Sequence, residues 1–304
     1  MTPLLTIFAA PKPFTNPHIA LIQRNAIRSW LALGDEVQVI LLGEETGLVE
    51  TAVELGVLHI PEVERNASGT PLVSSMFTLA RQASQSPYLG CINADIVLTP
   101  GVLTATQTLG SQAQRFLMVG QRWDLAVTEP LDFGEGWANA LTSRAQSEGT
   151  LHRASGSDYF IFPRDCYTSM PRFAIGRAGW DNWMIFHGRW EHFPVVDASP
   201  DVTIIHQNHD YSHLPGGQPH YRLPETFENV RLAGGKRAIL ELSDATHTLQ
   251  NGKLKPRPLS WQRFWREIEL FPLTRLHSFP LAWAAFALFH PYKAYAAWRN
   301  RHQV

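Results

Sequence analysis

The sequence has little cysteine and no surplus of charge of either sign. Its 304 residues include two cysteines, Cys91 and Cys166, and both lie in apolar runs where a small thiol fits a protein core. Two such residues form no disulfide framework, which makes a reducing compartment the default. Lys and Arg (26) balance Asp and Glu (27), so no overall positive field draws the chain to nucleic acid. We expect a cytoplasmic protein without a nucleic-acid partner.

Long hydrophobic runs are also missing. The N-terminus has no basic segment followed by an extended apolar stretch, as a signal peptide would have. The most apolar late segment, 279–289, contains Pro280, ends before Pro291 and is too short to cross a bilayer as a helix. No transmembrane helix is therefore predicted.

The first hundred residues alternate between apolar runs and stretches with helical spacing. Strands are predicted at 4–9, 37–42, 57–60 and 88–98, and helices at 19–33, 50–55 and 73–83. Strands that alternate with helices favour an α/β fold with a mostly parallel central sheet and helices on both faces.

The alternation becomes less regular after Pro100. The segment 123–149 is polar and is interpreted as an inserted loop region, and from 223 onward we expect helices separated by prolines and no further strand. The boundaries are thus an α/β domain over 1–222 and a helical C-terminal extension over 223–304, packed on it. Between them, a helix after Gly101 and strands at 116–119, 159–162 and 202–206 are predicted.

Polar residues interrupt the apolar run Cys91-Ile92-Asn93-Ala94-Asp95-Ile96-Val97-Leu98. If the run is one strand, alternation puts Asn93 and Asp95 on the same side. A carboxylate in such a run is costly to bury without a partner, and a divalent cation is an efficient partner. The residues alone support a cation ligand and an Asp that caps a neighbouring turn about equally.

Three histidines, His206, His209 and His213, lie at or just beyond the end of the predicted strand 202–206. Three within eight positions make metal binding a reasonable hypothesis. Their spacing is not that of a known zinc site. Together with Asp95 they also permit a metal-dependent hydrolase, although the sequence has no His-Glu-X-X-His motif.

The run Asn93-Ala94-Asp95, followed by Ile-Val-Leu-Thr-Pro-Gly, resembles the Asp-X-Asp metal site of GT-A glycosyltransferases, and the resemblance covers roughly residues 4–213. It implies a Rossmann-like GT-A fold and transfer of a sugar from a nucleoside diphosphate sugar to an acceptor hydroxyl. It also implies a Mn²⁺ or Mg²⁺ ion held by Asp95. Asn93 stands where the family has its first Asp, which leaves open an inactive protein that only binds a nucleotide or carbohydrate.

The resemblance further implies residues that bind the donor. Ala10 and Pro11 correspond to the loop that contacts the base, and Glu44 to an acidic group near the base or ribose, although an exposed loop Glu is the commoner explanation. Arg65 precedes a predicted helix, so it either faces the diphosphate or belongs to a solvated loop. Asp158 either binds sugar hydroxyls or satisfies its own turn.

The resemblance also supplies a catalytic base and completes the metal site. Asp181 is similar to the carboxylate that, in inverting members, deprotonates the acceptor hydroxyl; a helix N-cap is the competing interpretation. His206 is the nearest equivalent of a late histidine ligand, with His209 as the substitute. Asn93 is placed with the donor-binding residues.

The last segment, from Trp261, interleaves Arg and Lys with aromatic side chains. The interpretation we favour is helices packed on the first domain with their charged faces outward. The alternative is peripheral contact with the inner face of a membrane. The acceptor is accordingly predicted as a sugar, a lipid-linked molecule or a small molecule.

Overall fold

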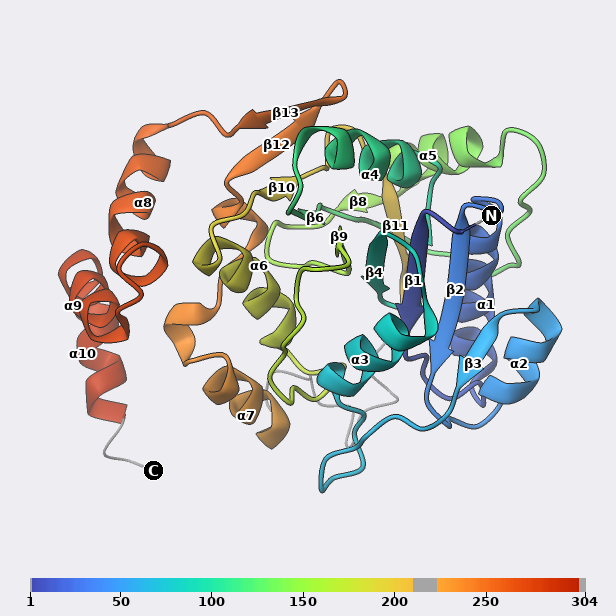
Figure 1. Ribbon diagram of the computed structural model, residues 1–304, viewed down its shortest axis with the longest axis horizontal. Helices are drawn as coiled ribbons and strands as arrows, with labels where there is room; N and C mark the ends of the chain where they lie inside the picture. The colour runs from blue at the N-terminus through green and yellow to red at the C-terminus, as the bar shows by residue number, and fades with distance from the viewer. Residues whose placement is uncertain (1, 210–222, 301–304) are drawn as a thin grey trace.

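A nine-stranded sheet forms the centre of the computed structural model, which describes residues 2–209 and 223–300 (Figure 1). Its strands are β1 Leu5–Ala9, β2 Val37–Leu42, β3 Leu58–Ile60, β4 Tyr88–Ile92, β6 Leu117–Val119, β9 Tyr159–Pro163, β10 Val195–Asp197, β12 His247–Gln250 and β13 Lys253–Pro256. The order is β13-β12-β10-β6-β9-β4-β1-β2-β3. Neighbours pair in parallel except at β9 and β13, which confirms the predicted mostly parallel α/β sheet.

Helices cover both faces of this sheet, as alternation along β1 requires. Leu5, Ile7 and Ala9 pack in one apolar cluster with three helices: α1 Pro17–Leu31, α2 Leu48–Leu55 and α4 Gly101–Gln112. Phe8 points to the other face, where the cluster includes α3 Val73–Ala83 and α6 Trp180–Trp190. Period-two burial along the strand thus divides the core into two layers.

A second, four-stranded sheet has the order β5-β11-β7-β8. Its strands are β5 Ile96–Leu98, β7 Trp123–Leu125, β8 Thr150–Leu151 and β11 Ile204–Gln207, and α5 Trp137–Glu148 packs against it through Leu141 and Ala145. The prediction of an irregular loop over 123–149 is wrong, because this segment contains both β7 and α5.

The predicted strand 88–98 is also wrong in one respect. The chain leaves the large sheet after Ile92 and turns, with the Ile96 N–H donating to the Asn93 carbonyl at 3.0 Å, before it enters the small sheet as β5. Asn and Asp favour such turns because their side chains replace backbone partners. Asn93 and Asp95 therefore lie in a turn that joins the two sheets.

The C-terminal part contains strands as well as helices, contrary to the prediction. β12 and β13 form a hairpin at the edge of the large sheet, joined by Asn251 and Gly252 with φ of 51° and 67°, and Asn-Gly is the usual signal for such a turn. The helices are α7 Pro224–Leu232, α8 Trp261–Thr274, α9 Phe279–Phe289 and α10 Pro291–Asn300, with short 3-10 turns at Lys236–Ala238 and Leu242–Asp244. Among the described helices, none has the length and hydropathy needed to span a bilayer.

Candidate functional site

The candidate site lies where the order of the sheet reverses. From β1 the chain proceeds outward through β2 and β3, and then returns to form β4 on the other side of β1. In an open α/β sheet the carboxyl ends of two such strands flank a crevice that binds ligands. Lys12 follows β1 and Asp95 follows β4, and the Lys12 Nζ lies 3.7 Å from Asp95 Oδ2.

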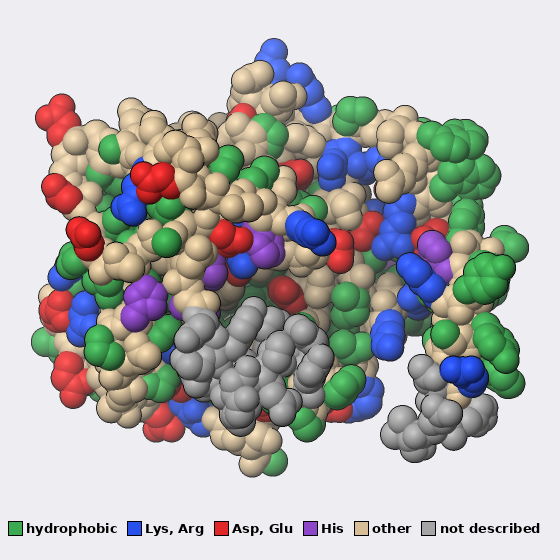
Figure 2. Space-filling view, turned by 180° about the vertical axis from the view of Figure 1, so that it is seen from behind, with side chains coloured by type: hydrophobic (Ala, Val, Ile, Leu, Met, Phe, Trp, Pro, Cys, Tyr) green, Lys and Arg blue, Asp and Glu red, His purple; other side chains and the backbone are tan. Residues whose placement is uncertain are grey.

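Asp95, His206 and His209 form a cluster whose ligand atoms all lie within 4.8 Å of one another. Asp95 is 9% exposed, and its Oδ2 lies 3.0 Å from His209 Nε2. Its Oδ1 is buried and has no hydrogen-bond partner among residues 2–209 and 223–300. On the face seen in Figure 2, histidine side chains (purple) gather beside acidic and basic ones. His213, the third predicted histidine, lies outside the described residues.

The Asp95 carboxyl is held in its ionised form. Burial alone raises its pKa, but the hydrogen bond with His209 and the nearby charges of His206 and Lys12 outweigh this and keep the pKa well below the ordinary aspartate range. A buried carboxylate with one unsatisfied oxygen, beside two imidazoles, is a donor set that fits a divalent cation.

Strand register brings a further carboxylate to this cluster. His206 on β11 pairs with Asp124 on β7, and the His206 Nδ1 lies 3.1 Å from Asp124 Oδ1. The contact lacks hydrogen-bond geometry, since His206 Nδ1 has no hydrogen-bond partner among the described residues. A carboxylate this close places negative charge beside the imidazole, which favours binding of a cation by that ring. Burial raises the pKa of Asp124, but His206, His152 and Arg122 hold it well below its usual range. Sequence reasoning missed Asp124, since its partners are near only in the folded chain.

Replacing Asp124 with asparagine is expected to weaken cation binding about 10- to 100-fold, because the negative charge beside the His206 imidazole would be lost. Calorimetric titration with Mn²⁺ measures the affinity. Asp165→Asn is the matched control, since Asp165 is an exposed carboxylate away from the cluster. Equal affinities for the two variants would show that the charge of Asp124 does not support cation binding by His206.

Gln207 fixes the backbone of the turn that carries Asp95. Its side chain is fully buried, and its Nε2 donates to the Asp95 carbonyl at 3.1 Å and to the Ile22 carbonyl at 2.7 Å. The Asn25 Nδ2 donates to Gln207 Oε1 at 3.0 Å. Strand β11 and helix α1 thus hold the Asp95 turn in place.

Asn93 and Asp158, both predicted to bind the donor, bind each other. The Asn93 Nδ2 donates to Asp158 Oδ1 at 2.8 Å, and Arg122 Nη1 donates to Asp158 Oδ2. Both carboxylate oxygens of Asp158 are therefore engaged by the protein. An amide at position 93 has a clear physical reason, since it can donate to Asp158 where a second carboxylate would repel it.

Asn93→Asp is expected to reduce the free energy of unfolding by roughly 1–3 kcal/mol near neutral pH, because it removes a partly buried donor and places two carboxylates together. Like charge raises the folded-state pKa of the new carboxyl. The electrostatic part of the loss should therefore be full above that pKa and should vanish below the unfolded pKa. Urea unfolding of both proteins over a range of pH measures this difference in the free energy of unfolding. The exposed Asn139→Asp in α5 serves as the control, and equal effects of the two changes would contradict the prediction.

Two other predicted donor residues form an ion pair. The Arg65 Nε lies 3.2 Å from Glu44 Oε1, the Arg65 Nη2 lies 2.9 Å from Glu45 Oε1, and Nη1 donates to the Gly69 carbonyl at 2.8 Å. The loops after β2 and β3 are thereby linked. Ala10 and Pro11 follow β1, with Ala10 partly exposed and Pro11 buried.

Asp181 lies in the first turn of α6, and its Oδ1 accepts the Gly179 N–H at 3.0 Å. The N-cap residue is Gly179, so the N-cap interpretation of Asp181 does not hold. Burial raises the pKa of Asp181 to about 6, against the lowering effect of nearby backbone N–H groups, and the charge of Asp158 adds to the rise. Asp181 is therefore electrostatically coupled to the Asn93–Asp158 pair.

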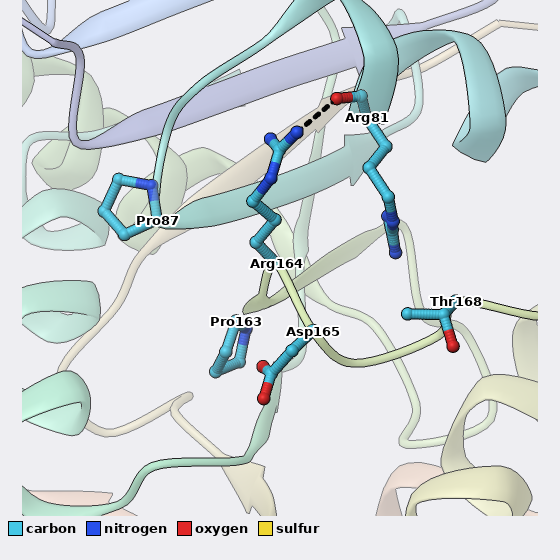
Figure 3. Close-up of a pocket in the computed structure, with 6 residues that line it drawn as sticks. All are labelled: Arg81, Pro87, Pro163, Arg164, Asp165 and Thr168. Carbon is cyan, nitrogen blue, oxygen red and sulfur yellow. Dashed lines mark hydrogen bonds between the residues drawn. The ribbon is translucent and has the colours of Figure 1, made fainter.

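A cavity of about 390 Å³ lies elsewhere (Figure 3). One of its lining residues, Pro163, pairs with Tyr88 at the amino end of β4, whereas the metal-ligand cluster follows the carboxyl end of that strand. Its two arginines, Arg81 and Arg164, donate to backbone carbonyls. This cavity is separate from the candidate site.

No protein-family model and no curated protein matches the sequence. The structure is similar to a mannosyltransferase from Pyrobaculum calidifontis in complex with GDP-Man and Mn²⁺, with 13% identity and a TM-score of 0.42 over 67% of this chain and 57% of that one. It is also similar to glucosyl-3-phosphoglycerate synthase from Mycobacterium tuberculosis in complex with Mn²⁺, UDP and glucosyl-3-phosphoglycerate, with 15% identity and a TM-score of 0.45 over 86% and 88% of the two chains.

Both of these proteins are glycosyltransferases, the class that the sequence resemblance names. This chain spans little more than half the length of the mannosyltransferase.

Proposed function

We propose that this protein is a metal-dependent glycosyltransferase, which moves a sugar from a nucleoside diphosphate sugar to an acceptor hydroxyl. One observation carries the proposal: an ionised, buried carboxylate, Asp95, keeps one oxygen unsatisfied at the point where the sheet order reverses, with His206 and His209 beside it. That position is where open α/β sheets bind nucleotides.

Asp95, His206 and His209 would hold the cation. Two imidazoles beside one carboxylate favour Mn²⁺ over Mg²⁺, because Mg²⁺ takes oxygen ligands. When bound, the ion would neutralise charge that grows on the leaving diphosphate as the sugar bond breaks. Asn93 donates a hydrogen bond to Asp158. We therefore assign it no bond to the cation and consider it a residue that positions Asp158.

Lys12 supplies a second positive charge at the same place. Its Nζ lies 3.7 Å from Asp95 Oδ2 and 3.2 Å from His209 Nε2. Gln23 fixes the Lys12 backbone by accepting its N–H at 2.6 Å and donating to its carbonyl at 2.9 Å. An ammonium held at the edge of a metal site is suited to bind the phosphate oxygens of a donor.

Asp181 would act as the general base if the reaction inverts the anomeric centre. With a pKa of about 6 it is ionised at neutral pH and still basic enough to accept a proton from a sugar hydroxyl as that hydroxyl attacks. Asp158, whose charge contributes to this raised pKa, binds Asn93, which lies in the same turn as Asp95. A retaining reaction would need no base at this position.

Titration calorimetry with a panel of nucleoside diphosphate sugars, with and without Mn²⁺, tests the proposal. We expect one donor to bind with an affinity that rises when Mn²⁺ is added, and the bound donor to be consumed when acceptors are supplied. A metal-dependent hydrolase would show no link between metal and nucleotide affinity. A binding protein without activity would bind the donor and never release free nucleoside diphosphate.

A further inference from the structure

Helix α8 packs on the protein through a mixed face. Leu270 and Leu273 are buried in the apolar core, and charged side chains lie beside them. The Arg266 Nε lies 2.8 Å from Asp244 Oδ1, and the Glu267 Oε2 lies 2.5 Å from Arg189 Nη2. Asp244 and Arg189 are both buried. The interpretation of charged faces directed outward is therefore wrong for α8. Since charged side chains are rarely buried and apolar faces normally are, the outward face of this helix needs an explanation.

The outward surface of α8, α9 and α10 is apolar and aromatic. Trp261 is 73% exposed, Leu288 79% and Tyr292 90%. Most of the exposed large hydrophobic side chains in the described part of the chain belong to this surface. It includes a groove of about 580 Å³ between α8 and α9, whose apolar lining includes Leu259, Phe264, Ile268, Phe271, Leu288 and Phe289. Contiguous exposed apolar surfaces of this kind mark sites where a protein binds a partner, a ligand or a membrane.

Charge indicates what covers this surface. Residues 275–304 include no Asp or Glu, and they carry Arg275, Lys293, Arg299 and Arg301. The acidic residues of α8, Glu267 and Glu269, form ion pairs with Arg189 and Arg266. Lys293 and Arg299 are exposed on α10, next to Tyr292, Tyr295 and Trp298. A partner that is both apolar and negatively charged fits this combination, and an anionic lipid bilayer has both properties. Trp and Tyr also favour the boundary between lipid and water.

A second copy of the chain fits less well. A two-fold contact through this surface would set the same patch against itself, and so would bring the basic residues of both copies together without acidic partners from 275–304. We propose that α8, α9 and α10 dock flat on an anionic bilayer, with the aromatic side chains in the interface and the basic ones at the lipid headgroups. This inference does not depend on the proposed transfer reaction.

Flotation of the full chain with lipid vesicles tests the inference. We expect the protein to float with vesicles of phosphatidylcholine and phosphatidylglycerol, about two to one, roughly 10-fold more than with phosphatidylcholine alone, and added salt should reduce the binding. Failure to float with either vesicle would overturn the inference. So would a stable dimer in light scattering that binds no vesicle, because a second copy would then cover the surface.

Substitutions distinguish docking of α8, α9 and α10 on the bilayer from non-specific binding through any exposed apolar side chain. The combined change Trp261→Ser, Leu288→Ser and Tyr292→Ser alters only exposed side chains, so thermal melting should change little while vesicle binding is lost. Val53→Ser with Phe227→Ser is the matched control, since these are 79% and 65% exposed elsewhere. Lys293→Glu with Arg299→Glu should weaken binding to anionic vesicles roughly 10-fold or more, and the exposed Lys253→Glu should not. Equal loss in variants and controls would contradict the inference.

Discussion

Replacing Asp95 with asparagine should abolish Mn²⁺-linked nucleotide binding and lower the rate of sugar transfer by at least about 100-fold. The change keeps the size and the Oδ1 of the side chain and removes its charge. In the folded protein that charge is the one carboxylate among the three clustered ligands, and an amide does not replace it for a divalent cation. Calorimetry with Mn²⁺ and a transfer assay measure the two losses.

The control for Asp95→Asn is Asp35→Asn, the same change at an exposed position before β2, which should retain binding and transfer. Melting curves without metal show whether the Asp95 variant is folded. Because the folded-state pKa of Asp95 is lowered, its charge stabilises the protein above the unfolded pKa and this contribution is lost at acid pH. A folded Asp95→Asn variant with intact Mn²⁺-linked binding would remove the basis of the proposed function.

Asp181→Asn should reduce kcat by about 10²- to 10⁴-fold, the usual contribution of a general base, and leave Mn²⁺ binding unchanged. In the unchanged protein, the rate should rise with pH through about 6 as Asp181 ionises, and then level off. The variant should lack this step. A pH–rate profile with saturating donor measures it.

Stability separates a catalytic from a structural role for Asp181. Its folded-state pKa, about 6, is above the ordinary 3.8, so burying the charge costs free energy that is fully present above about pH 6 and vanishes below the unfolded pKa. Asp181→Asn should therefore melt at a higher temperature near neutral pH and at an unchanged temperature in acid. A lower melting temperature with unchanged kcat would show that Asp181 only stabilises the start of α6.

Several elements could be predicted because their signals are local. The runs that became β1, β2 and α3 have the required spacing and clear ends, and Asp95 stands out as a carboxylate among apolar residues. The break at 93–95 was missed because periodicity does not distinguish a strand that continues from one that turns into a second sheet. The Asn251-Gly252 pair, a local signal for a two-residue hairpin turn, marks the β12–β13 hairpin in the sequence.

The rest of the site depends on pairings between distant segments. Asp124 lies beside His206 because β7 and β11 pair in that register. Arg122 donates a hydrogen bond to Asp158, which lies in a segment distant in the sequence. No local pattern marks these residues, because their partners are far apart in the chain. The same holds for Lys12, whose position depends on β1 and β4 being neighbours.

The two edges of the large sheet limit how copies of the protein can associate. One edge strand, β3, has three residues, and the other, β13, carries Lys253, Lys255 and Pro256. Short length, lysine charge and a residue without an N–H all discourage another strand from pairing there. Self-assembly by strand addition is therefore disfavoured at both edges of this sheet, even when the protein is concentrated at a surface.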